Sequence, residues 1–259
     1  MPLDTTFSRY ADEHHLLRGM GEFLGDLNGV EVLEYGCGLG ELTVVLARSG
    51  ATVTSFDLSA DSIEVARRRA LRNDVADRIT FVVANGEDLP FGDGRFDVAV
   101  GKAVLHHLEP TLAARELARV LRPGGRAAFS EPLGTNPFLV LARDRVPYPG
   151  KHERGADRPL TRADLAAWRE PFERVSLRPL QLFSMIERLF GHHRRLGPLQ
   201  ALDRWLLTHE PRLWPWCRYA VLLFEASPSP SVEPAAEREE PATELAGASL
   251  SADANPVGA

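Results

Sequence analysis

Cysteines and long apolar runs are scarce in this sequence of 259 residues. Its two cysteines, Cys37 and Cys217, cannot build a disulfide framework, and neither lies at the spacing of a metal site. We therefore expect two free thiols and no metal centre. No run of 18 or more apolar residues occurs, so we expect no stable membrane insertion. The first residues also lack the charged and apolar regions of a signal peptide, which predicts a cytoplasmic protein.

Basic residues are not in excess either. The net charge is −6, and residues 226–259 carry six acidic residues against Arg238 alone, which leaves the remainder close to neutral. Nonspecific nucleic-acid binding relies on many phosphate contacts and requires a basic face. We expect the basic runs at 67–69 and 192–195 to be solvated helix faces, and we predict no nucleic-acid partner.

Residues 226–259 contain no aromatic side chain and are rich in Ala, Ser, Pro and Glu. Such a composition cannot bury enough apolar surface to offset the entropy that ordering costs. We therefore expect a disordered acidic tail at 226–259 after one folded domain at 1–225, a length that suits a single sizeable core.

Apolar runs of strand length alternate with stretches of helical periodicity, which predicts a parallel, doubly wound α/β sheet. The strand-like runs lie at 30–35, 51–56, 79–84, 96–101, 126–131, 174–183 and 217–225, and the early helices at 41–49, 60–73 and 111–121. An N-terminal helix is expected within 1–28, where Leu16, Leu17, Met20, Phe23 and Leu24 recur at helical intervals. Two insertions, at 133–172 and 184–213, are longer than such a sheet requires.

The first strand leads into a glycine turn. Residues 32–40 read Val-Leu-Glu-Tyr-Gly-Cys-Gly-Leu-Gly, and Asp57 ends the next apolar run. Such a turn lets a ligand approach the backbone, the following helix offers free N–H groups, and a carboxylate about 20 residues further on can bind a ribose. The third glycine comes one residue earlier than in a dinucleotide-binding turn. Glu34 would also repel a pyrophosphate, but it suits an ammonium or sulfonium group.

Further segments follow in an order that resembles the class I S-adenosylmethionine (SAM) methyltransferases of small molecules. They read Val83-Ala-Asn-Gly-Glu-Asp-Leu-Pro-Phe, Phe96-Asp-Val-Ala-Val, Val104-Leu-His-His-Leu and Val120-Leu-Arg-Pro-Gly-Gly-Arg. The resemblance covers residues 30–132 and implies an α/β, Rossmann-like, doubly wound seven-stranded sheet with an antiparallel last strand. It also implies a helical substrate cap built from 1–28, 133–172 and 184–213.

The resemblance implies that SAM is the cofactor and S-adenosylhomocysteine (SAH) the product. It also implies that a small organic molecule of specialised metabolism accepts the methyl group on O, N or C. Glu34 would hold the amino group of the methionine part, directly or through water, and Asp57 the ribose hydroxyls. Asn85 and Gly86 stand where the family contacts adenine, and Leu58 would pack on the adenine face. The expected cofactor-binding residues are Glu34, Gly36, Gly38, Asp57, Leu58, Asn85, Gly86 and Lys102.

A methyl group on a sulfonium is a strong electrophile, so the protein mainly aligns the reactants, and a base matters only for a hydroxyl or a protonated amine. The candidate catalytic residues are His106, His107, Glu131 and His15, and the candidate substrate-binding residues are Tyr10 and His14. The histidines could instead start a helix or pack, and Glu131 could pair with an arginine of the cap. Metal-binding relatives carry carboxylates where this chain has Ala103 and His106, which again predicts no metal.

Two other functions stay open at this point. The chain could bind SAM while catalysing a cyclisation or decarboxylation, in which case its activity would release no SAH. It could also be a noncatalytic SAM-sensing subunit whose acceptor pocket is filled. The sequence does not indicate an oligomeric state.

Overall fold

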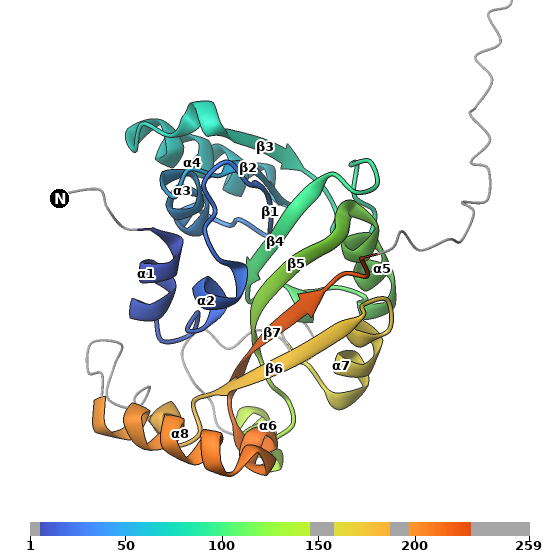
Figure 1. Ribbon diagram of the computed structural model, residues 1–259. Coiled ribbons are helices and arrows are strands. Elements are labelled where there is room, and N and C mark those ends of the chain that lie inside the picture. The colour runs from blue at the N-terminus through green and yellow to red at the C-terminus, as the bar shows by residue number, and fades with distance from the viewer. Residues whose placement is uncertain (1–5, 146–157, 187–196, 229–259) are drawn as a thin grey trace, which may run out of the picture.

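The computed structural model describes residues 6–145, 158–186 and 197–228, and its strands form one seven-stranded sheet in the order β3-β2-β1-β4-β5-β7-β6 (Figure 1). The strands are β1 (Glu31–Tyr35), β2 (Thr52–Asp57), β3 (Ile79–Val83), β4 (Phe96–Lys102), β5 (Leu121–Pro132), β6 (Arg174–Leu180) and β7 (Tyr219–Glu225). The first five are parallel, and β7 runs antiparallel between β5 and β6. The predicted fold class, with its antiparallel last strand, is confirmed.

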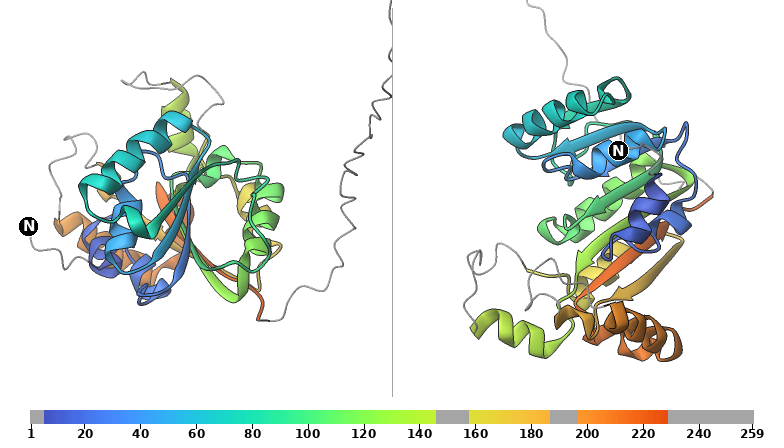
Figure 2. Two further views of the ribbon diagram at one scale, coloured as in Figure 1. Left: turned by 90° about the horizontal axis from the view of Figure 1, so that it is seen from above. Right: turned by 90° about the vertical axis from the view of Figure 1, so that its left-hand side faces the viewer.

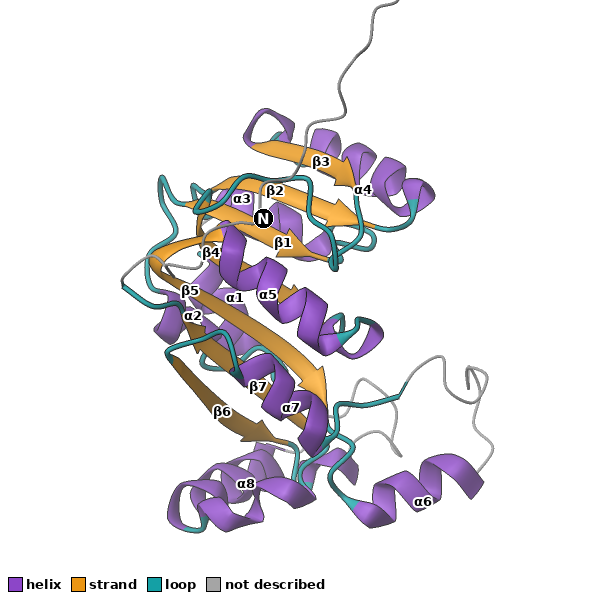
Figure 3. Ribbon diagram, turned by 90° about the vertical axis from the view of Figure 1, so that its right-hand side faces the viewer, coloured by secondary structure: helices purple, strands orange, loops and turns teal. Residues whose placement is uncertain are grey.

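Helices cover both faces of this sheet (Figure 2). One face carries α1 (Phe7–Glu13), α2 (Met20–Leu24), α3 (Glu41–Arg48) and α4 (Ala60–Arg72), and the other carries α5 (Pro110–Val120) and α7 (Arg162–Arg169), as Figure 3 shows. Beyond β6 lie α6 (Pro137–Arg145) and α8 (Gly197–His209), and short 3₁₀ turns are η1 (Ala76–Arg78), η2 (Leu105–His107) and η4 (Pro211–Trp216). The alternation of side chains along β1 explains this layering, because Leu33 and Tyr35 pack with α5 while Val32 packs with α3.

The N-terminal segment departs from the expected single helix. Residues 14–19 form a turn between α1 and α2, and Gly19 has φ +87°, a left-handed conformation that ends a regular helix. The side chain of Arg178 from β6 lies against Gly19, where a Cβ would come within 2.5 Å of its Nη1. Leu17, Met20 and Leu24 are still buried against the sheet. The apolar spacing therefore identified the buried residues but missed the break between the helices.

Two boundaries of the expected cap and tail also differ. Helix α7 lies within 133–172, yet Trp168 and Phe172 belong to the main core and α7 packs on α5. At the other end, the N–H of Ala226 donates to Gly125 O, and the N–H of Gly124 to Ser227 O, so the chain remains attached to β5 past residue 225. The rest of the expected tail, 229–259, lies outside the described residues.

Trp168 generates a stability prediction. Its side chain is fully buried, and within the described ranges its indole N–H has no hydrogen-bond acceptor. Trp168→Ala should lower the free energy of unfolding by about 3–5 kcal/mol, because it leaves a large cavity. Trp168→Phe should cost much less, since no hydrogen bond is lost. Urea unfolding measures both, with the exposed Trp205→Ala as control; equal losses for the Ala and Phe variants would contradict this packing.

Candidate active site

The glycine turn joins β1 to α3 at the carboxyl ends of the parallel strands, where the strand order reverses between β1 and β4. Gly36 has φ +62°, and a Cβ there would lie 2.7 Å from Cγ2 of Val104 in the turn after β4. Gly38 has φ +50°, and no atom lies within 4 Å of the position of its Cβ. Gly36 thus permits close packing between two turns, while Gly38 leaves open space for a ligand beside the backbone.

Asp57 holds this turn in place from the end of β2. Its Oδ2 accepts the N–H of Gly38 at 2.9 Å, and its Oδ1 accepts the N–H of Ser59 at 2.9 Å. The next residue, Leu58, is 76% exposed although it is apolar. A half-buried carboxylate beside an exposed apolar side chain is a fitting surface for a sugar and an aromatic base.

Glu34 lies beneath the turn rather than on its surface. Its carboxylate is buried, and Oε2 accepts the hydroxyls of Thr43 at 2.5 Å and Ser55 at 2.6 Å. Burial raises the pKa of Glu34 to about 7, although the two hydroxyls partly oppose this effect. The structure therefore gives Glu34 partners within the protein, and a contact with the methionine part of a cofactor stays a prediction.

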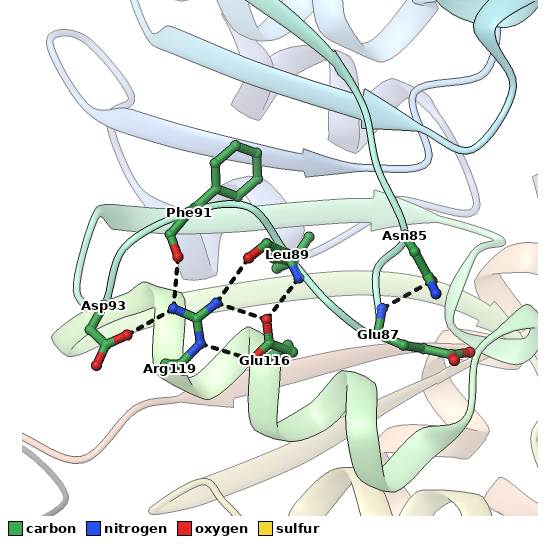
Figure 4. Close-up of polar contacts among 7 residues, drawn as sticks. All are labelled: Asn85, Glu87, Leu89, Phe91, Asp93, Glu116 and Arg119. Carbon is green, nitrogen blue, oxygen red and sulfur yellow. Dashed lines mark hydrogen bonds and ion pairs between the residues drawn. The ribbon is translucent and has the colours of Figure 1, made fainter. Parts of the chain in front are cut away.

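Arg119 of α5 fixes the segment that follows β3 (Figure 4). Its guanidinium donates to the carbonyl oxygens of Phe91 at 2.7 Å and Leu89 at 3.1 Å, and to Glu116 and Asp93 at 2.7 Å each. The hydrogen bonds with Glu116, followed by that with Asp93, raise the pKa of Arg119. Glu116 also accepts the N–H of Leu89 at 2.8 Å. The segment is therefore held mainly through its backbone, with Asp93 as an additional side-chain contact.

Asn85 and Gly86 begin this fixed segment. The side chain of Asn85 is exposed, and its Oδ1 accepts the N–H of Glu87 at 3.1 Å (Figure 4). Gly86 is buried, and a Cβ there would lie 3.3 Å from Tyr35. Glu87 in turn accepts the N–H of Glu109 at 2.8 Å. The segment after β3 is thus tied to the segment after β4.

Glu131 organises the turn after β4. It is fully buried at the end of β5, and its Oε1 accepts the N–H groups of Val104 at 2.8 Å and Leu105 at 2.9 Å. Its Oε2 lies 2.7 Å from Nδ1 of His106, whose side chain is only 3% exposed. The ring of the exposed His107 lies 4.0 Å from that of His106. Glu131 therefore holds the turn and orients His106, and in the described part of the cap it forms no ion pair with an arginine.

The connection between α1 and α2 reaches the same edge of the sheet. Nε2 of His14 lies 3.4 Å from Nζ of Lys102 at the end of β4, and the ring of His14 stacks on that of His15 at 5.5 Å. The ring of Tyr10 is 5.8 Å from that of His14. Burial, followed by the charges of Glu41 and Glu34, raises the pKa of Tyr10. The structure thus brings Tyr10, His14 and Lys102 together, while His15 also faces α8.

Sequence reasoning missed the buried carboxylates of Asp164 and Asp203 altogether. Asp203 of α8 accepts the N–H groups of Leu182 at 3.0 Å, Phe183 at 2.8 Å and Ser184 at 3.0 Å. An acidic residue among the leucines of a helix was the available signal, but its partners lie on another segment. Both cysteines are buried free thiols. Within the described part of the chain, no three His, Cys, Asp or Glu side chains are placed to hold a metal ion, and no helix is long and apolar enough to span a membrane.

Comparison with known proteins agrees with this geometry. Residues 33–129 match the family model of a methyltransferase domain. The methyltransferase GfsG of Streptomyces halstedii is 40% identical over 105 residues, which are 40% of this chain and 38% of that protein. The ubiquinone/menaquinone biosynthesis C-methyltransferase UbiE of Hahella chejuensis is 35% identical over 170 residues, 62% of this chain and 66% of that protein. The chain thus aligns with about two fifths to two thirds of the length of these relatives.

The solved structure of the [4+2]-cyclase SpnF superposes with a TM-score of 0.60 at 22% identity, covering 88% of this chain and 86% of that one. At this identity the likeness establishes the fold alone. This chain therefore shares its arrangement of strands and helices with that protein over 88% of its length, which is more than the 40% and 62% that align with the two sequence relatives.

Glu34 makes the stability of the protein depend on pH. A carboxyl whose pKa is raised on folding contributes stability that is fully present below its unfolded pKa of about 4.5 and is lost as the pH rises through about 7. Between pH 5 and pH 8 the ionisation of Glu34 should lower the free energy of unfolding by about 2–3 kcal/mol. Glu34→Gln should lose that part of the pH dependence, as measured by urea unfolding. The exposed Glu64→Gln serves as control, and parallel losses in Glu34→Gln and the unaltered protein would refute the assignment.

Proposed function

We propose, from the premise that this chain belongs to the class I SAM-dependent methyltransferase family, that it transfers a methyl group from SAM to a small organic acceptor and releases SAH. The observation that carries the proposal is the closure of the glycine turn on Asp57 where the strand order reverses. Specialised metabolism in the cytoplasm, and the absence of a nucleic-acid partner, are further parts of the proposal.

The residues at this edge fit the cofactor. Asp57 would accept from the ribose hydroxyls, Asn85 and the N–H of Gly86 would contact the adenine edge, and Leu58 would cover its face. The open position beside Gly38 and the 76% exposure of Leu58 support this placement, because both leave surface for a ligand. When bound, SAM supplies the electrophilic methyl group. The protein's part is then to align the acceptor and exclude water, which can contribute about 7–11 kcal/mol.

His106 is the base that we propose for an acceptor with a hydroxyl or a protonated amine. Its Nδ1 lies 2.7 Å from a carboxylate oxygen of Glu131, which fixes the tautomer in which Nδ1 carries the proton and Nε2 is basic. Glu131 is a positioning residue here, because its other oxygen is bonded to the backbone. His107, adjacent and exposed, would contact the acceptor.

A non-methylating reaction on the same scaffold is the second candidate, because the fold superposes on that of a [4+2]-cyclase. One experiment separates the candidates. Calorimetric titration of SAM and SAH tests the cofactor site, and incubation with phenols, amines and acids follows, with SAH release measured by chromatography. Conversion of an acceptor with SAH release supports methylation, conversion without SAH supports the alternative, and no binding of either cofactor refutes both.

Asp57→Ala should raise the dissociation constant of SAH by at least about tenfold, because a charge-assisted hydrogen bond contributes about 1.5–3 kcal/mol. Calorimetry measures the constant, and the melting temperature shows that the variant is folded. The matched control is Asp61→Ala, an exposed acid in the first turn of α4. An unchanged affinity in Asp57→Ala would remove the proposed ribose contact.

His106→Gln should lower kcat about 100-fold for an acceptor that must lose a proton, because it removes the proposed base. Glu131→Gln should reduce kcat while the dissociation constant of SAH stays within about twofold, because the amide oxygen of Gln can still accept the N–H groups of Val104 and Leu105 and only the contact with the imidazole is altered. Both are measured with the acceptor identified by the SAH-release screen, and the exposed His209→Gln is the control. A His106→Gln variant that keeps the kcat of the unaltered protein would exclude His106 as the base.

A further inference from the structure

A groove of about 460 Å³ lies beside the candidate active site, between the α1–α2 connection, the end of β6 and α8. Because β5 and β6 both run antiparallel to β7, they are parallel to each other, and Leu180 lies at the same edge of the sheet as Glu131. His15 lines the groove and stacks on His14, which reaches Lys102. The groove thus begins next to the end of β4, where methyl transfer would occur.

The walls of this groove are held by polar contacts. Asp203 is 4% exposed and fixes α8 to the turn after β6 through the three backbone N–H groups described above. On the opposite wall Arg178 pairs with Glu22 at 2.7 Å and packs against Gly19. Both walls are therefore in place before any ligand arrives, as a binding site requires.

The lining combines apolar surface with cationic charge. Leu177, Leu180 and Leu207 supply the apolar part. Three acids line the groove: Asp203 accepts backbone N–H groups, Glu22 pairs with Arg178, and Asp12 lies exposed on α1. Arg204 of α8 faces the groove, is exposed, and has no ion-pair partner among the residues that the structure places. An exposed arginine beside the leucines of the groove is suited to a carboxylate on an otherwise apolar molecule.

We propose that this groove binds the distal part of the methyl acceptor, an apolar molecule that ends in a carboxylate, and that Arg204 pairs with that carboxylate. The proposal rests on the methyltransferase function proposed above. Three strand spacings, about 14 Å, separate β4 from β6, and Arg204 belongs to α8, which packs against β6. The acceptor is therefore elongated, and its acid group serves recognition while another atom is methylated.

The test uses decanoate and decan-1-ol, which differ in charge at one end of the same chain. Calorimetry on the full-length protein, with and without saturating SAH, should show decanoate binding about tenfold more tightly than the alcohol. Arg204→Met should abolish this preference, and Arg204→Glu should reverse it. Arg169→Met, an exposed arginine at the end of α7 on the other face, should leave it unchanged. Melting temperatures show whether each variant is folded.

Equal affinities for the acid and the alcohol, or a preference that survives in Arg204→Met, would overturn the proposal. A separate titration of SAH in the same samples distinguishes the two hypotheses. If SAH binds but the preference for decanoate is unchanged in Arg204→Met, only the groove proposal is refuted. If SAH does not bind, the methyltransferase function is refuted, whatever the affinity for decanoate.

Discussion

The carboxylate of Glu131 connects the two halves of the candidate site. It holds the backbone of Val104 and Leu105, and the side chain of Val104 occupies the space that a Cβ on Gly36 would need. The position of the turn after β4 and that of the glycine turn are thus interdependent, and Asp57 closes the latter from β2. The turn that carries His106 and the glycine turn are thereby kept in register by one buried side chain.

A buried carboxylate destabilises the folded state unless hydrogen-bond donors surround it. In this protein buried carboxylates accept backbone N–H groups of loops and thereby hold these loops in place. Glu131 and Asp203 are both buried and both accept backbone N–H groups, three of them in the case of Asp203. Glu34 differs because its donors include two hydroxyls, and burial outweighs them enough to raise its pKa to about 7. Glutamate is therefore a backbone anchor at position 131 and a group of raised pKa at position 34.

These buried carboxylates lie in two parts of the fold: the region that matches the methyltransferase domain and its edge, and the elements added to the sheet. The region that matches the methyltransferase domain, residues 33–129, contains the glycine turn, Asp57 and the His106 turn. The α8 wall of the groove lies outside it and is fixed by Asp203 alone among the contacts discussed. Acceptor choice in such folds is a property of elements added to the sheet, so two proteins can share the cofactor residues and differ in substrate.

Local signals in the sequence determined the strands, the glycine turn and Asp57, because apolar period, glycine spacing and strand ends are properties of neighbouring residues. The resemblance to a known family added the antiparallel last strand and the cofactor. Tertiary structure alone decided the rest. Arg178 of β6 packs on the break at Gly19, the role of Glu131 depends on the backbone of another strand's turn, and Asp203 acts on residues about 20 positions away. Such contacts form only when distant segments meet, and no local pattern encodes which donors a buried carboxylate will find.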